Sequence, residues 1–247
     1  MTRAESIRCT LCGVLATGIV RIERSSPTGK AFARDASKIP SGVLVRHALE
    51  HVFRIRMFRP LDMLAAVRLQ ETDDQTATIW ARYARSEAVH DRYFLRDLKA
   101  MGVDRSKVEV HRPFGATLRL GKFLESAALE FGSVPIVLYS FWAEENSDVG
   151  SAPIIDAARE RFGTESARGA SSHRALDENL DHAEVISRVL AAIIRDDQEL
   201  LLAARLLDII TEFVLDYFCE LDAWHRDCSS VVRSRPILED YGVSARL

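Results

Sequence analysis

Apolar residues recur every three or four positions along most of the chain, and strand-like alternation is scarce. Val45, Ala48 and Val52 show this spacing in the first core segment. Because such a period places apolar side chains on one face of a helix, each segment predicts a helix with a buried side. The first helix is expected to begin near Ser41 and to end before Pro60. The sequence therefore predicts an all-α bundle of about seven to eight helices without a sheet.

Turn residues divide the rest of the chain into further segments. Thr72–Gln75 has the form of a capping box and predicts a helix that runs unbroken over residues 73–101. Residues 1–40, rich in basic and small residues, are expected to form a loosely ordered arm. The helical domain then spans residues 41–228, followed by a polar tail over residues 229–247. Other helices are expected over residues 116–131, 136–146, 154–162, 171–194 and 198–224.

Composition narrows the classes of partner. A hydrophobic fraction of 47% over 247 residues is enough for a buried core. With 33 basic and 36 acidic residues, no strong field favours nucleic acid or an anionic membrane as a partner. No stretch approaches the ~20 apolar residues that span a bilayer. Because neither nucleic acid nor a membrane is indicated as a partner, we expect a small-molecule substrate. Four unevenly placed cysteines do not suggest a disulfide framework and favour a reducing, cytoplasmic compartment.

Glu87 and His90 stand three residues apart in the predicted 73–101 helix, so their side chains share one face. A carboxylate and an imidazole together suit iron, and E-x-x-H pairs supply ligands in carboxylate-bridged iron proteins built from helices. Common residue types also produce this spacing by chance. Glu87 as a surface charge and His90 as a core histidine remain the alternatives.

Two further positions offer ligands. Glu144 and Glu145 end an apolar segment, and a buried carboxylate is costly unless it is paired or bound to metal. An exposed helix end is the alternative for either residue. His173 and Asp177, four residues apart, share a face of the predicted 171–194 helix. His182 lies half a turn out of phase with His173 unless that helix contains a bulge.

This order of motifs resembles the haem-oxygenase-like diiron oxidases and oxygenases, whose fold is shared by thiaminase-II and quinone-cofactor-synthesis proteins. The resemblance covers about residues 41–225, and the stretches Tyr139–Glu145 and His173–Asp177 are most similar to the family. It implies a seven- to eight-helix haem-oxygenase-like bundle that binds metal. The ligands it implies are Glu87, His90, Glu145, His173 and Asp177, with Glu144, Asp181 and His182 as less certain ones.

One position departs from the family pattern. The family usually continues H-x-x-x-D-x-x-H, and Leu180, which has no ligand atom, stands where the last histidine is expected. The number of Fe(II) ions, one or two per chain, therefore stays open. Asp181 or His182 could replace the missing ligand through a local distortion of the helix.

The resemblance implies a non-haem iron enzyme that uses O2 as a co-substrate. Its expected substrate is a small, nitrogen-containing metabolite, oxidised by N-oxygenation or by oxidative carbon–carbon cleavage. No catalytic residue apart from the metal ligands is expected, and an external electron donor and a homodimer are compatible with this architecture. Two alternatives stay open: a metal-free enzyme of the same fold, like the thiaminase-type or quinone-cofactor-synthesis proteins, and a helical binding protein.

His47 and His51 form a second candidate pair on the first core helix, with Glu50 beside them. Their four-residue spacing can bind zinc, but without a third nearby ligand it is frequent by chance. Most aromatic residues, among them Tyr83 and Phe94, are expected in the core, with a substrate pocket as the alternative for some.

Overall fold

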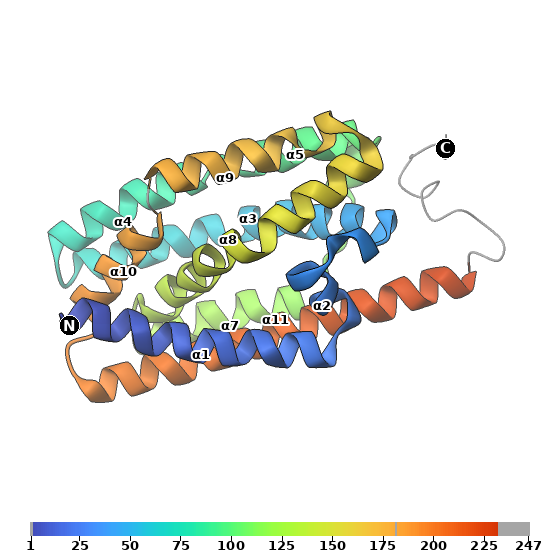
Figure 1. Cartoon of the computed structure of the whole chain (residues 1–247). Helices are drawn as coiled ribbons and strands as arrows, with labels where there is room; N and C mark the ends of the chain where they lie inside the picture. The colour runs from blue at the N-terminus through green and yellow to red at the C-terminus, as the bar shows by residue number, and fades with distance from the viewer. Residues whose placement is uncertain (1, 181, 232–247) are drawn as a thin grey trace.

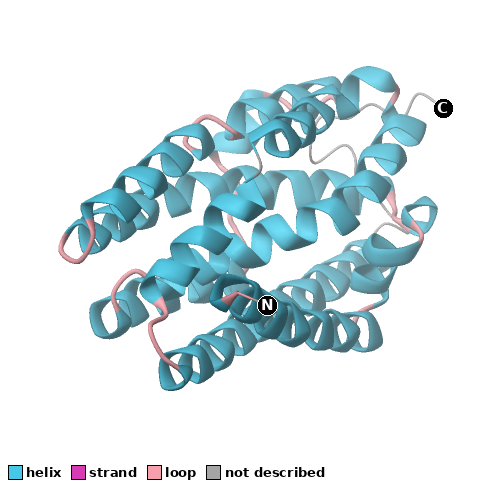
Figure 2. Cartoon of the chain, turned by 60° about the vertical axis from the view of Figure 1, so that its left-hand side comes forward, coloured by secondary structure: helices cyan, strands magenta, loops and turns pink. Residues whose placement is uncertain are grey.

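The computed structural model describes residues 2–180 and 182–231, without the side chains of 36, 147–151, 177–180 and 229–231. In this part of the chain the protein is helical and contains no strand (Figures 1 and 2), so the all-α prediction is confirmed. Short 3-10 turns cover Ala36–Lys38 and Thr164–Ala167. The α-helices are α1 (Arg3–Ser25), α2 (Pro27–Arg34), α3 (Ser41–Gln70), α4 (Asp74–Glu87), α5 (Asp91–Ala100), α6 (Arg105–Glu109), α7 (Gly115–Phe131), α8 (Val134–Phe162), α9 (Arg168–Leu180), α10 (His182–Ile193) and α11 (Asp197–Val231).

The helices pack around a central apolar core. Helices α1 and α11 lie side by side along one edge of the bundle, α4, α5 and α9 lie along the opposite edge, and α8 crosses between them (Figure 1). Trp80 and Phe141 are fully buried in the main cluster, to which α1, α3, α7, α10 and α11 also contribute. Among the described helices, none combines the length and apolar character needed to cross a membrane.

The expectation of a loosely ordered arm over residues 1–40 is wrong for most of that segment, because α1 and α2 occupy it. Ile7, Leu11 and Leu15 are buried against the bundle at helical spacing. Gly18 lets α1 approach α11 closely, since a Cβ there would lie 2.4 Å from a Thr211 methyl group. The basic and small residues that suggested disorder instead form the exposed and contact faces of a packed helix.

Two proline residues lie inside helices, at places where the sequence predicts the end of one helix and the start of another. Pro60 lies inside α3, and Pro153 lies inside α8, which joins the two segments predicted over 136–146 and 154–162. A proline within a helix removes one backbone hydrogen bond. In these long helices the packing on both sides of the proline outweighs that loss.

One helix predicted as continuous is instead divided. The predicted 73–101 helix breaks after Glu87 into α4 and α5, whereas the predicted 171–194 helix corresponds to α9 and α10, described on either side of residue 181. At the α4–α5 break the His90 amide donates to the Glu87 carbonyl at 3.0 Å, and the Tyr93 amide donates to the His90 carbonyl at 3.1 Å. These three-residue bonds tighten the turn without a glycine or proline.

The first turn of α9 packs closely on α5. The backbone amides of Gly169 and Ala170 donate to the Asp97 carboxylate at 2.6 and 2.7 Å. A Cβ on Gly169 would lie only 2.0 Å from the Tyr93 carbonyl oxygen. Only glycine permits this approach, which places His173, one turn further along α9, over the α4–α5 break.

Replacing Gly169 with alanine should therefore separate α9 from α5. We expect Gly169→Ala to lower the free energy of unfolding by about 2 to 3 kcal/mol, because the clash is with backbone that cannot rotate away. Gly13→Ala is the matched control, since a Cβ there meets nothing within 4 Å, and it should stabilise by about 0.5 to 1 kcal/mol. Denaturant unfolding measures both changes, and equal stability of the two variants would contradict the close contact.

Candidate metal centre

The first group of candidate ligands forms at the α4–α5 break. Glu87 is the last residue of α4, and His90 lies in the turn that follows, fully buried. His90 Nδ1 lies 2.9 Å from Glu87 Oε2. The E-x-x-H pair is therefore brought together by the tight turn and not by a continuous helix.

His173 joins this pair from α9. Its ring centroid lies 4.2 Å from that of His90, in an edge-on arrangement. Glu87, His90 and His173 each offer one ligand atom, and these atoms lie within 4.8 Å of one another. The two helices predicted to carry ligand pairs therefore do meet.

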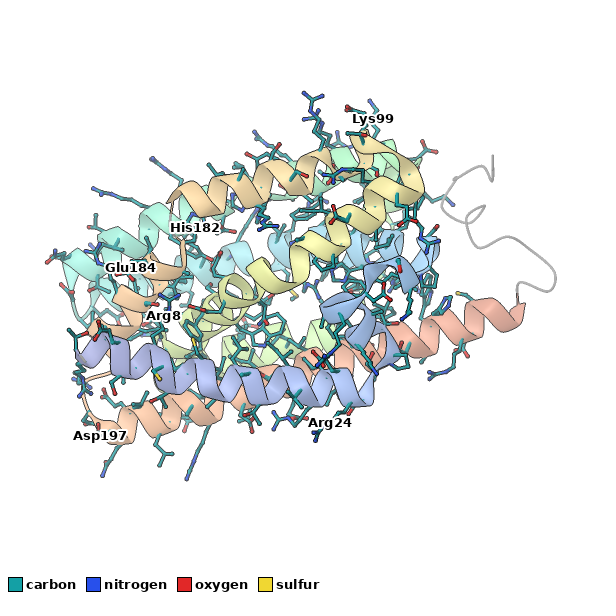
Figure 3. The ribbon with its side chains drawn as sticks, viewed as in Figure 1. Arg8, Arg24, Lys99, His182, Glu184 and Asp197 are labelled. Atoms are coloured by element: carbon teal, nitrogen blue, oxygen red, sulfur yellow. The ribbon has the colours of Figure 1, made fainter. Side chains whose placement is uncertain are left out.

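A second group shares Glu87 with the first. His182 Nδ1 lies 3.3 Å from Glu87 Oε1 and 3.7 Å from Glu144 Oε1. Glu87, Glu144 and His182 also offer ligand atoms within 4.8 Å of one another. One carboxylate thus faces both groups, with Oε2 toward His90 and Oε1 toward His182. Figure 3 shows His182 at the start of α10, where that helix meets the bundle interior.

His182 does not share a straight helix with His173. On such a helix it would point about half a turn away. Helix α10, whose first residue is His182, runs in a different direction from α9 (Figure 1), and the His182 side chain is 3% exposed. The side chains of Asp177 and Leu180, and the whole of Asp181, lie outside the described residues.

The two adjacent glutamates of α8 face different partners. Glu145 Oε1 lies 2.9 Å from Arg8 Nη2, and Cys12 Sγ donates to Glu145 Oε2 at 3.7 Å, so Glu145 faces α1. Among the described residues it belongs to neither candidate group, whereas Glu144 is buried and does. The preference for Glu145 came from family spacing, when α1, the helix that carries its partners, was expected to be a loose arm. Figure 3 labels Arg8 on this helix.

Two groups that sequence reasoning did not assign to the site surround the carboxylates. The Tyr83 hydroxyl donates to Glu144 Oε1 at 3.0 Å. Burial raises the pKa of Tyr83 well above its ordinary value, and the nearby carboxylates raise it further, so this phenol keeps its proton. Burial, with a smaller contribution from Glu87, raises the pKa of Asp62 to about 8. Asp62 follows Pro60 on α3, where the helix was expected to have ended.

The donor set fits a transition metal. Two carboxylates and three imidazoles lie together inside an otherwise apolar bundle, on α4, the α4–α5 turn, α8, α9 and α10. Glutamates gathered around a shared site repel one another unless a cation lies between them. Mixed carboxylate and imidazole ligands suit iron.

Comparison with known proteins identifies the fold. No protein-family model matches the chain, and no curated protein sequence matches it. The crystal structure of a domain of unknown function with a haem oxygenase-like fold from Shewanella denitrificans OS217 superimposes with a TM-score of 0.72. The match is 17% identical and covers 90% of this chain and 93% of that one. The chain has a haem-oxygenase-like fold. The fold expected from the order of the motifs is confirmed, with α1 and α2 as part of it.

The haem-oxygenase-like bundle contains a cavity of about 280 Å³ that reaches the candidate metal centre. His173 lines it, and so does Phe94, whose ring centroid lies 5.4 Å from that of His173. His47 and His51, considered above as a zinc pair, line the same cavity. The Tyr217 hydroxyl lies 2.7 Å from His47 Nδ1, and neither histidine belongs to a candidate metal group of the described residues.

His47 gives this haem-oxygenase-like protein a specific dependence of stability on pH. Burial, and then the charge of Arg54, lowers the pKa of His47 from 6.5 to about 3. Between these values the unfolded chain binds a proton that the folded chain does not, so stability falls as pH falls through this interval. In His47→Gln this contribution is absent, so we expect the unfolding free energy of the variant to fall less steeply with falling pH. The difference between the two slopes should reach up to about 1.4 kcal/mol per pH unit. Urea unfolding measures it, and identical slopes in both proteins would show that His47 is protonated in the fold.

Proposed function

We propose that this haem-oxygenase-like protein is a non-haem diiron enzyme that uses O2 to oxidise a small organic substrate held in the adjacent cavity. The observation that carries the proposal is Glu87, one carboxylate that faces two groups of candidate ligands. If these side chains formed only a structural ion-pair network, one partner for each carboxylate would be enough. Here five ligand-type side chains converge from separate elements on one buried place.

The two irons would share Glu87 in this proposal. Glu87, His90 and His173 would hold the first, and Glu87, Glu144 and His182 would hold the second. Reduced iron with such ligands supplies the electrons and the open positions needed to activate O2. Because His182 takes the role that Leu180 cannot, two irons per chain are proposed. Asp177 remains a predicted ligand.

The chain's own residues prepare the site. Tyr83 keeps its proton and donates a hydrogen bond to Glu144 Oε1, which fixes the orientation of that carboxylate. The fully buried His90 and the 3% exposed His182 keep bulk water away from the centre. The cavity beside His173 holds the substrate within reach of the irons.

The finer parts of the proposal follow the family resemblance. A small, nitrogen-containing substrate and either N-oxygenation or carbon–carbon cleavage are proposed on that basis. Each turnover that leaves the irons oxidised requires an external electron donor. The homodimer and the cytoplasmic location stay predictions.

The neighbouring glutamates provide a matched test of the second iron. We expect anaerobic Fe(II) titration of the metal-stripped chain to saturate near two irons, as the two ligand groups require. Glu144→Gln should lose about one of them, because an amide is a far weaker ligand than a carboxylate. Glu145→Gln, which removes only the ion pair with Arg8, should keep both. Loss of iron in Glu145→Gln alone would assign Glu145 instead of Glu144 as the ligand. No specific uptake of iron by the wild type would favour the metal-free alternative.

The shared role of Glu87 has its own test. His173→Ala and His182→Ala should each lose about one iron from opposite groups, whereas Glu87→Ala should lose both. Stopped-flow exposure of the Fe(II)-loaded chain to O2 should show rapid consumption in the wild type and little in any of the three variants. Circular dichroism checks that helical content is preserved. Full iron content in Glu87→Ala would contradict the bridging role.

A further inference from the structure

Arg54 on α3 lies inside the cavity beside the candidate metal centre. Its guanidinium carbon lies 4.6 Å from the centroid of the Tyr217 ring, and its Nη2 lies 3.4 Å from His51 Nδ1. Both contacts are to neutral groups. Burial alone would lower the pKa of Arg54, but the nearby phenols of Tyr217 and Tyr139 and the Glu50 carboxylate raise it overall, so the guanidinium keeps its charge.

No carboxylate pairs with Arg54 among the residues that the structure describes. Arg46, two turns earlier on the same helix, shows the usual arrangement, with its Nη2 2.9 Å from Glu50 Oε1. Glu50 also accepts from the Thr117 hydroxyl at 2.8 Å and from the Phe114 amide at 2.9 Å. Its two oxygens therefore accept from other donors, and it forms no ion pair with Arg54, although its charge still acts on the guanidinium.

The other charged groups of the cavity lining already have partners. Glu23 pairs with Arg34, whose Nε donates to it at 2.7 Å. Asp97 accepts the two backbone amides at the start of α9. Arg174 is engaged in an interaction of its own. Arg54 therefore presents a positive charge to an apolar cavity without an ion pair from any carboxylate that the structure describes.

The two cavity histidines do not add to this charge. Burial lowers the pKa of His47 to about 3 and that of His51 well below its ordinary value, and the charge of Arg54 acts in the same direction. Both rings are neutral at physiological pH. An anion that entered the cavity would contact the guanidinium of Arg54, which is flanked by neutral hydrogen-bonding groups.

We infer that the ligand of this cavity carries a carboxylate, which Arg54 binds. An arginine confined to an apolar site is stabilised by an anion, and its planar fork matches the two oxygens of a carboxylate. The rest of the lining is mainly apolar, including Phe94 and Trp142, and accommodates a hydrocarbon body. His173 lines the same cavity, so a molecule held by its carboxylate at Arg54 extends toward the metal centre. This inference rests on the proposed function, because it takes the cavity as the substrate site.

Matched acids and amides test the inference without knowledge of the natural substrate. Benzoate, phenylacetate and phenylpropionate, each with the corresponding amide, are titrated into the metal-stripped full chain by calorimetry. We expect at least one acid to bind about tenfold or more tightly than its amide, which has the same shape without the charge. Equal binding of acid and amide, no binding of any acid at millimolar concentration, or equally tight binding of inorganic phosphate would overturn the inference.

Variants assign the preference to Arg54. Arg54→Gln should abolish the difference between acid and amide, and Arg54→Lys should keep part of it, since lysine retains the charge but loses the fork. Arg68→Gln is the matched control, because Arg68 lies on the same helix and pairs with Glu71 at 3.2 Å away from the cavity. If Arg54→Gln loses its helical content, Arg54→Lys tests the inference instead, and we expect it to bind the acid more weakly than the wild type does. An unchanged preference in Arg54→Lys and in a folded Arg54→Gln would overturn the inference.

The metal-stripped chain separates this inference from the diiron proposal. Acid preference that depends on Arg54 in a chain that takes up no iron supports the carboxylate site and overturns the diiron proposal. Uptake of two irons without acid preference overturns the carboxylate site and leaves the diiron proposal intact.

Discussion

The carboxylates of Glu87 and Glu144 both lie against the imidazole of His182 inside an apolar bundle, and most features of the surrounding structure follow from that arrangement. Carboxylates this close repel one another, and burial increases the cost of their charges. Tyr83 offsets part of the cost by donating to Glu144, and three histidines complete a donor set that could hold metal. Burial raises the pKa of Asp62 on α3, and the charge of Glu87 adds a smaller contribution.

The helical framework brings these side chains together where its helices turn and meet. The α4–α5 turn brings Glu87 to His90, and the start of α10 brings His182 to both glutamates. Between these two places, α9 is held against α5 by the hydrogen bonds that Asp97 accepts from backbone amides and by the absence of a side chain at Gly169. Close helix packing therefore helps to fix the position of His173.

Local patterns predicted part of this arrangement. Helical spacing indicates the all-α class. E-x-x-H together with His173 identifies three of the five converging residues, and the family resemblance adds Glu144 and His182 as less certain ligands. The helix boundaries failed where tertiary packing overrides local preference, as at Pro60 and at the α4–α5 break. The choice between adjacent glutamates depends on Arg8, more than a hundred residues away in the sequence. Arg54 could not be identified from the sequence, where a buried arginine looks the same as one in solvent.

The change of direction between α9 and α10 also bears on how such sites diversify (Figure 1). In one straight helix, two ligands must keep a fixed number of residues between them, because each added residue rotates the next by about 100°. When two helices of different direction carry the ligands, the phase of the second helix is set independently of the first. The spacing between His173 and His182 is thereby released from the helical repeat, and chains with quite different spacings can build the same constellation. A search that requires one fixed motif length will overlook them.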